Sequence, residues 1–214
     1  MMPLDFLWKA HHSMIIDNVC DFSHAYLHRR RRPFVGAKLT HLEAEEDRVL
    51  LAYETKVGGG RISGLMVDRK STNTDAMTLG YEYPYQWSNT GDRIKHWCFV
   101  LPIDEQTTRA FFIFYFSHKA LKIPFLSVHL PSALLHWIMP IAKETVVRPL
   151  LEEDGDAVEA EQEGYNAHFE QPIAELNPAV SALQQLTLRK WEEHIQKSRS
   201  RLSAPSASAS DGAE

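Results

Sequence analysis

The chain has 214 residues, of which 44% are apolar and 24% charged, and its formal net charge is −5. This length and composition suit one soluble domain with a sizeable core, and the mildly acidic balance argues against a nucleic-acid-binding protein. The chain has only two cysteines, Cys20 and Cys98, which excludes a disulfide framework. The sequence shows no signal-peptide segment and no apolar run of the ~20 residues that a membrane span needs, so we expect a cytoplasmic protein.

The first half of the chain predicts one helix followed by strands. Apolar residues at helical spacing indicate a helix over 15–28. Period-two alternation then predicts antiparallel strands over 48–57, 57–67, 78–87, 94–103 and 109–118. The tyrosine-rich stretch 78–87 should place its aromatic residues on one face, with Pro84 marking an edge or a bend. The stretch 109–118 is apolar on both faces and should be covered on both sides.

Beyond about residue 130 the apolar period changes to that of helices. We expect helices over 131–147 and 150–168, and a third that begins at Asn177-Pro178, with a cap residue followed by a first-turn proline. The Ser/Ala-rich segment 203–214 should be a disordered tail after a domain over 1–202. This order predicts an α+β fold with helices packed against a curved antiparallel sheet.

A group of polar residues stands out in the first predicted helix. Asp21, His24 and His28 follow one another at offsets of three and four, which places them on one helical stripe. Two imidazoles at i and i+4 can bind one metal ion. A solvated polar face formed by chance in a histidine-rich chain is the alternative, and these residues alone leave both interpretations open.

The acidic predicted helix offers a third ligand type. Its segment reads ED-x4-E-x2-Q and contains Asp154, Glu159 and Gln162. Two neutral imidazoles and one carboxylate form the donor set of a non-haem iron site with open positions. The alternative for this helix is a solvated acidic face.

Together the two segments resemble the catalytic domain of Rieske non-haem iron oxygenases, the ring-hydroxylating and O-demethylating enzymes. In that family the first segment reads N-x2-D-x2-H-x3/4-H, which Asn18, Asp21, His24 and His28 match position by position. The family's distal carboxylate falls on Asp154. The resemblance covers roughly residues 10–200 and implies a START-like helix-grip fold.

The resemblance also implies roles and partners. His24, His28 and Asp154 would hold Fe(II), Asp21 would link the iron to the cluster of a neighbouring subunit, and Asn18 would lie near the iron. The substrate would be an aromatic or other apolar small molecule, and the assembly a homotrimer. The C-x-H and C-x2-H pairs that bind a [2Fe–2S] cluster do not occur in this sequence. We therefore expect that cluster only through a partner, a separate Rieske or ferredoxin protein or domain.

Two other functions are compatible with parts of this pattern. A START-like carrier of hydrophobic ligands with a relic metal site would share the fold, while a zinc hydrolase would need an H-E-x2-H-type base that the sequence lacks. Other polar residues are weaker candidates for a site. Asp17, Glu153 and Asp156 miss the ligand positions of the motif, and His11 and His12 suggest a solvated pair. His96 either lines a cavity or lies in the core, and the arginines 29–32 suggest a redox-partner contact, a subunit contact or a solvated surface.

Overall fold

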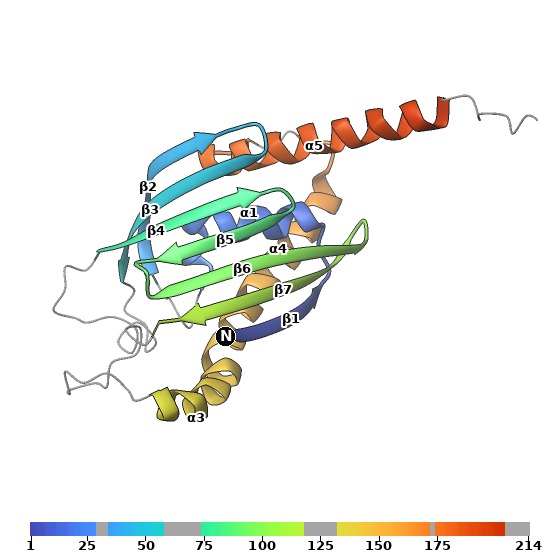
Figure 1. Cartoon of the computed structure of the whole chain (residues 1–214). Coiled ribbons are helices and arrows are strands. Elements are labelled where there is room, and N and C mark those ends of the chain that lie inside the picture. Colours follow the sequence, from blue (N-terminus) through green and yellow to red (C-terminus); the bar gives the residue numbers. More distant parts are fainter. Residues whose placement is uncertain (29–33, 58–73, 118–131, 172–173, 204–214) are drawn as a thin grey trace, which may run out of the picture.

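The computed structural model describes residues 1–28, 34–57, 74–117, 132–171 and 174–203. In these ranges the chain forms one seven-stranded antiparallel sheet with the order β1-β7-β6-β5-β4-β3-β2 (Figure 1). Neighbours from β2 to β7 follow one another along the chain, and β1 completes the sheet beside β7. The strands are β1 (Met2–Trp8), β2 (Phe34–Ala44), β3 (Arg48–Val57), β4 (Thr74–Glu82), β5 (Tyr85–Thr90), β6 (Ile94–Asp104) and β7 (Thr107–Phe116).

Helices pack against one face of this sheet (Figure 1). The helical elements are α1 (His12–Cys20), the 3-10 helix η1 (Phe22–Tyr26), α3 (Ser132–Ala142), the π-helix η2 (Lys143–Val147), α4 (Arg148–His168) and α5 (Pro178–Ser203). Helix α1 contacts β5 and β6 as well as α4 and α5, while α4 contacts β1 and α5 contacts β2 and β3. The expected α+β helix-grip fold, a curved antiparallel sheet packed with helices, is confirmed.

Period-two burial in the strands builds the core on the helix side of the sheet. In β1 buried and exposed residues alternate, so Met2, Leu4, Phe6 and Trp8 face the helices. Each large apolar side chain buried in this way stabilises the fold by ~1.5–3 kcal/mol relative to an exposed one. Other fully buried members of the core are Ile15, Ile16, Val49, Leu51, Leu79, Tyr81, Phe112, Val158, Leu183 and Leu186. This core holds α1 and α4 against the sheet, beside the candidate site.

The predicted C-terminal helices are present. The predicted helix over 150–168 corresponds to α4, and the one over 131–147 is divided into α3 and η2. Helix α5 begins at Pro178, as the sequence predicts. Asn177 caps it, because its Oδ1 accepts the Ala179 N–H at 3.0 Å.

Two predictions about the strands are wrong. The stretch 78–87 is a hairpin rather than one strand, because Pro84 lacks an N–H and lies in the turn between β4 and β5. The tyrosines of this stretch therefore do not share a face, and Tyr81 is buried on the helix side. Strand β7 is not covered on both sides, since Arg109 and Tyr115 on its outer face are exposed.

Strands β1 and β2 have no counterpart among the predicted strands. The arginines 29–32, most of the predicted strand 57–67 and the tail beyond Ser203 lie outside the described residues. Within the described ranges, no helix is long and apolar enough to cross a membrane.

Candidate metal centre

A break in the chain direction at Asp21 places the two histidines. Asp21 has φ −94° and ψ 96°, which ends α1 and begins η1. Its carboxylate accepts the Ser23 N–H at 2.8 Å, a local bond that competes with the helical hydrogen-bond ladder. His24 lies on η1 and His28 follows it. The prediction of one continuous helix over 15–28 is therefore wrong, and the three polar residues do not share a helical stripe.

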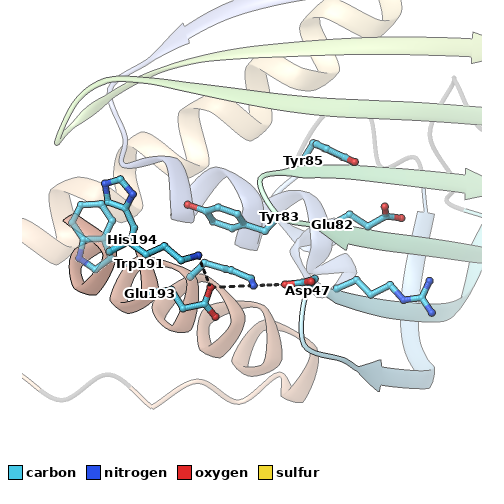
Figure 2. Close-up of a pocket in the computed structure, with 10 residues that line it drawn as sticks. Asp47, Glu82, Tyr83, Tyr85, Trp191, Glu193 and His194 are labelled. Carbon is cyan, nitrogen blue, oxygen red and sulfur yellow. Dashed lines mark hydrogen bonds and ion pairs between the residues drawn. The ribbon is translucent and has the colours of Figure 1, made fainter. Parts of the chain in front are cut away.

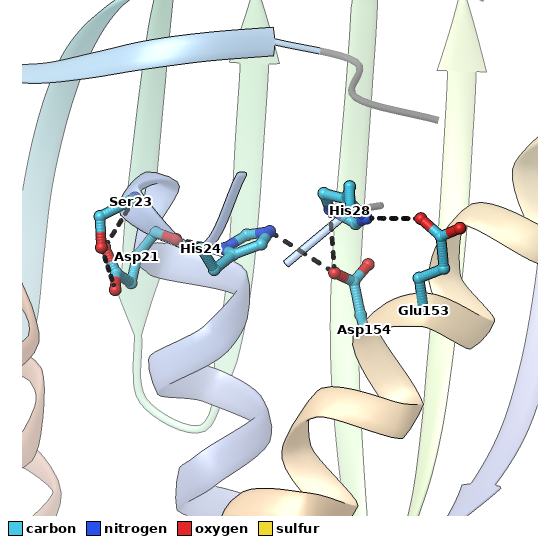
Figure 3. A network of polar contacts seen from close by, with 6 residues as sticks. All are labelled: Asp21, Ser23, His24, His28, Glu153 and Asp154. Atoms are coloured by element: carbon cyan, nitrogen blue, oxygen red, sulfur yellow. Dashed lines mark hydrogen bonds and ion pairs between the residues drawn. The ribbon is translucent and has the colours of Figure 1, made fainter. Parts of the chain in front are cut away.

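The two histidines nevertheless converge on Asp154 of α4 (Figure 3). The Nε2 atoms of His24 and His28 lie 3.5 Å and 3.2 Å from Asp154 Oδ1. One potential ligand atom from each of the three side chains lies within 4.8 Å of the other two. The three residues proposed from the sequence as metal ligands thus meet at one point, although they come from different elements.

The outer contacts of each imidazole determine which ring nitrogen carries the proton. His24 Nδ1 contacts the backbone carbonyl of Asp21, and because a carbonyl only accepts, Nδ1 donates and Nε2 holds the lone pair. His28 Nδ1 lies 3.2 Å from Glu153 Oε2, and the tautomer that donates to this carboxylate leaves a lone pair on Nε2. Both lone pairs therefore face Asp154. Partners of this kind orient the imidazoles of metal sites.

Burial shapes the electrostatics of the site. Asp154 Oδ1 is buried and, within the described residues, has no hydrogen-bond partner, although the Nε2 atoms of His24 and His28 lie 3.5 Å and 3.2 Å away. Burial, and then Glu153, raises the pKa of Asp154 well above its usual value. Burial, and then His28, lowers the pKa of His24 to about 4. Burial also lowers the pKa of His28, against the opposing effect of Glu153.

A bound cation would compensate this arrangement. A carboxylate oxygen and two nitrogen lone pairs that face one another repel, and a buried polar atom without a partner costs ~1–3 kcal/mol. A metal ion accepts electron density from all three atoms at once. Two neutral imidazoles and one carboxylate are the donor set of non-haem Fe(II) oxygenases, so the residues present fit that ion.

The other residues of the α4 motif anchor this helix to the segment between β1 and α1. Glu159 Oε1 accepts the Lys9 N–H at 2.8 Å, and Gln162 Oε1 accepts the His11 N–H at 2.8 Å. Both bonds join positions about 150 residues apart in the chain. They fix α4, and with it Asp154, relative to the start of α1.

Two features of the site were not predicted. Glu153, considered only as a weak ligand candidate, orients His28 instead. Gly155 allows Trp8 to pack against α4 directly beside Asp154, since a Cβ at Gly155 would lie 2.4 Å from Trp8 Nε1. The only sequence signal for this contact was a glycine inside a predicted helix.

Asn18 and Asp21 flank the three convergent side chains. Asn18 is buried in α1, and its backbone carbonyl accepts the Asp21 N–H at 3.3 Å. Asp21 contacts His24 through its backbone carbonyl, whereas its carboxylate accepts hydrogen bonds from Ser23 and Asn177. The Asp21 backbone, and not its carboxylate, therefore makes the contact with the His24 ring.

The other candidate histidines, His11, His12 and His96, make contacts within the fold and away from Asp154. His11 and His12 are not a solvated pair, because His11 caps α1 with its ring and burial lowers the pKa of His12 to about 4. His96 is half-buried, and its ring nitrogens lie 2.7 Å from Ser88 Oγ and 3.1 Å from Gln86 Oε1. These contacts are those of a core histidine whose hydrogen bonds are satisfied.

The remaining acidic candidates lie elsewhere. Asp156 is exposed on α4. Asp17 accepts a hydrogen bond from Gln184 Nε2 at 2.8 Å, and burial raises its pKa to about 7. Neither belongs to the group of residues found around Asp154 in the described part of the chain.

A separate groove lies between the turn joining β4 to β5 and helix α5 (Figure 2). Its volume is about 730 Å³, and its walls include Tyr83, Tyr85 and Trp191. An ion pair between Lys190 and Asp47 lies in its wall. None of the three convergent side chains lines this groove, so we assign it no part in the metal centre.

Comparison with known sequences supports these observations. Residues 8–198 match the family described as vanillate O-demethylase oxygenase C-terminal domain. The chain is 40% identical over 194 residues to a 4β-methylsterol monooxygenase of Methylococcus capsulatus (strain ATCC 33009 / NCIMB 11132 / Bath). That match covers 91% of this chain and 52% of the relative, so the chain spans about half the length of the curated protein it matches.

Solved structures share the fold. Dicamba monooxygenase bound to 3,6-dichlorosalicylic acid superposes with a TM-score of 0.60 at 11% identity, over 92% of this chain and 60% of that one. A quaternary ammonium Rieske monooxygenase gives a TM-score of 0.57 at 14% identity, over 88% of this chain and 49% of that one.

Proposed function

The chain belongs to the family of vanillate O-demethylase oxygenase C-terminal domains, the catalytic domains of Rieske oxygenases, and from this premise we propose that it is a non-haem Fe(II)- and O2-dependent oxygenase component. Residues 1–202 would form the catalytic domain. The observation that carries the proposal is the buried Asp154 Oδ1, which finds no hydrogen-bond partner in the part of the chain that the structure describes and lies within 3.5 Å of two imidazole nitrogens.

His24, His28 and Asp154 would hold the iron on one side. When bound, Fe(II) supplies the redox chemistry with dioxygen that these side chains cannot supply. Glu153 and the Asp21 carbonyl keep the two Nδ1 protons in place, so that both Nε2 atoms remain available as ligands. Asn18, whose backbone carbonyl also faces His24, would help to shape the wall of the site.

The reaction we propose is monooxygenation of an apolar substrate. Dioxygen, two electrons and two protons convert one C–H bond to C–OH and release one water molecule. The 40% identity to a methylsterol monooxygenase favours hydroxylation of a methyl group on a polycyclic lipid over hydroxylation of an aromatic ring.

The two electrons would come from a [2Fe–2S] cluster in a separate Rieske or ferredoxin protein or domain. We propose that electrons enter the metal centre at Asp21, because its backbone contacts His24 while its side chain is partly exposed. Inter-subunit electron transfer is described for the quaternary ammonium Rieske monooxygenase. A homotrimer, with the donor cluster of a neighbouring subunit beside Asp21, is the assembly we propose.

A non-enzymatic carrier of hydrophobic ligands is the alternative. Such a protein gains nothing from a buried carboxylate opposite two imidazole lone pairs, an arrangement that lowers its stability. An oxygenase that binds Fe(II) between these three side chains explains why the buried carboxylate lies opposite the two imidazoles.

Anaerobic titration with Fe(II) tests the proposal. The parent protein should bind one Fe(II) per chain, and His24→Ala, His28→Ala and Asp154→Ala should each lose most of that affinity. His41→Ala is the matched control, because the His41 side chain is 58% exposed on β2. Equal iron affinity in all four variants and the parent would refute the site.

A further inference from the structure

A hydrogen-bonded junction links the start of α5 to the metal centre through Asn177. The side chain of Asn177 uses both ends of its amide. Its Oδ1 accepts the Ala179 N–H at 3.0 Å, while its Nδ2 donates to Asp21 Oδ1 at 2.7 Å and to Tyr53 Oη at 3.2 Å. The amide orientation is defined by chemistry, because a carboxylate needs a donor.

Asp21 depends on this contact for its only long-range side-chain hydrogen bond in the described part of the chain. Its other side-chain bonds are local, from the Ser23 N–H at 2.8 Å and the Ser23 hydroxyl at 2.7 Å. Asn177 lies 156 residues further along the chain. The Asn177 amide therefore fixes the Asp21 turn relative to α5.

The position of Asp21 in turn decides the position of the His24 ring. The Asp21 carbonyl accepts the His24 backbone N–H at 3.2 Å and also contacts His24 Nδ1. A rotation of the Asp21 peptide would move this carbonyl away from the ring and release the tautomer that presents Nε2 to Asp154. A side-chain bond from Asn177 to the Asp21 carboxylate and the contact of the Asp21 carbonyl with the His24 ring thus link Asn177 to His24 through one residue.

The surroundings of Asp21 make a neutral donor important. Burial, and then the carboxylates of Glu161, Glu175 and Asp21, raise the pKa of Asp17, so Asp21 lies in an acidic neighbourhood. In this neighbourhood Asn177 supplies Asp21 with an uncharged donor and makes a hydrogen bond to a charged group, a type stronger than bonds between neutral partners.

We infer that Asn177 is a positioning residue of the metal centre, which holds Asp21 and through it the His24 imidazole. This inference rests on the proposed function. Its rival is an ordinary cap, in which Asn177 merely starts α5.

Two variants separate these roles. Asn177→Ser keeps a good N-cap but removes the amide donor, and Asn177→Asp keeps the cap but sets a second carboxylate against Asp21. In the metal-free protein both should still fold, with Asn177→Ser melting modestly below the parent and Asn177→Asp lower still, because both lose the bond to Asp21 and only Asn177→Asp adds repulsion. Tyr53→Phe is the control, because it removes only the hydroxyl that accepts the weaker Nδ2 bond.

Two measurements read the position of His24. Long-range proton–nitrogen NMR of the metal-free protein should show a shifted His24 Nδ1 resonance in both Asn177 variants, with His96 unchanged. Titration with Co(II), a spectroscopic substitute for Fe(II), should give a dissociation constant raised about 10-fold in Asn177→Ser and more in Asn177→Asp.

The outcomes distinguish this inference from the proposed function. If the parent binds Co(II) and both variants keep the parental His24 resonance and affinity, Asn177 is only a cap and the inference is overturned. If the parent binds neither Co(II) nor Fe(II) but the His24 resonance still shifts in both variants, the proposed function fails and the positioning role of Asn177 is supported.

Discussion

Asp154→Asn should stabilise the metal-free protein while it abolishes metal binding. The buried carboxylate faces two imidazole lone pairs, and its Oδ1 has no hydrogen-bond partner among the described residues. An asparagine amide fits the same space and donates protons to those lone pairs. Removing one unsatisfied buried group is worth ~1–3 kcal/mol, which for a chain of this size corresponds to about 2–4 °C in melting temperature per kcal/mol.

The gain should depend on pH with a defined sign. The pKa of Asp154 is raised in the folded protein, so its carboxyl costs stability as pH rises above the usual value of 3.8. The advantage of asparagine should therefore be small near pH 4 and larger at neutral pH.

Urea unfolding of chelator-treated protein, followed by circular dichroism at several pH values, measures this effect. Asp156→Asn is the matched control, since it changes the same charge at an exposed position of α4. If Asp154→Asn lowers the free energy of unfolding at neutral pH, or matches its control throughout, Asp154 is not the strained ligand described here.

Three further predictions follow from the contacts around the site. Glu153→Gln should weaken Fe(II) binding about 10-fold while Glu152→Gln, on the exposed side, leaves it unchanged, and equal titration curves would remove Glu153 from its orienting role. Gly155→Ala should destabilise the protein by ~1–3 kcal/mol in urea unfolding because its Cβ would collide with the Trp8 indole, whereas Gly164→Ala, with open space around it, should be neutral or stabilising. Equal effects of the two substitutions would contradict the packing of Trp8 against Gly155. Because burial lowers the pKa of His24 to about 4, the unfolded state binds this proton first, so the contribution of His24 to stability is lost as pH drops from about 6.5 toward 4. The urea midpoint of metal-free parent relative to metal-free His24→Ala should fall over this range, and a constant difference between the two would argue against a buried neutral ring.

Spacing in the sequence was sufficient to select the three residues that converge, but not to predict how they do so. The prediction of one helix over 15–28 missed the break at Asp21, because a local side-chain bond to the backbone outweighs helical periodicity there. His24 and His28 still converge on Asp154 because the packing of α4, rather than a shared helical stripe, sets their geometry.

Features that depend on tertiary packing were beyond the sequence patterns. The role of Glu153 depends on how α4 faces the segment after η1, and that of Asn177 on a contact 156 residues away. Local patterns were adequate for the cap of α5 and for an α+β fold with helices packed against an antiparallel sheet, since these follow from residue type and period, whereas the helix-grip fold was implied by the family resemblance.

Diffraction at the iron absorption edge tests the central claim most directly. Crystals grown and loaded with Fe(II) under anaerobic conditions should show one anomalous peak per chain, at bonding distance from the Nε2 atoms of His24 and His28 and from a carboxylate oxygen of Asp154. A peak bound by other residues, or no peak in protein that has taken up iron, would contradict the metal centre and the oxygenase function proposed from it.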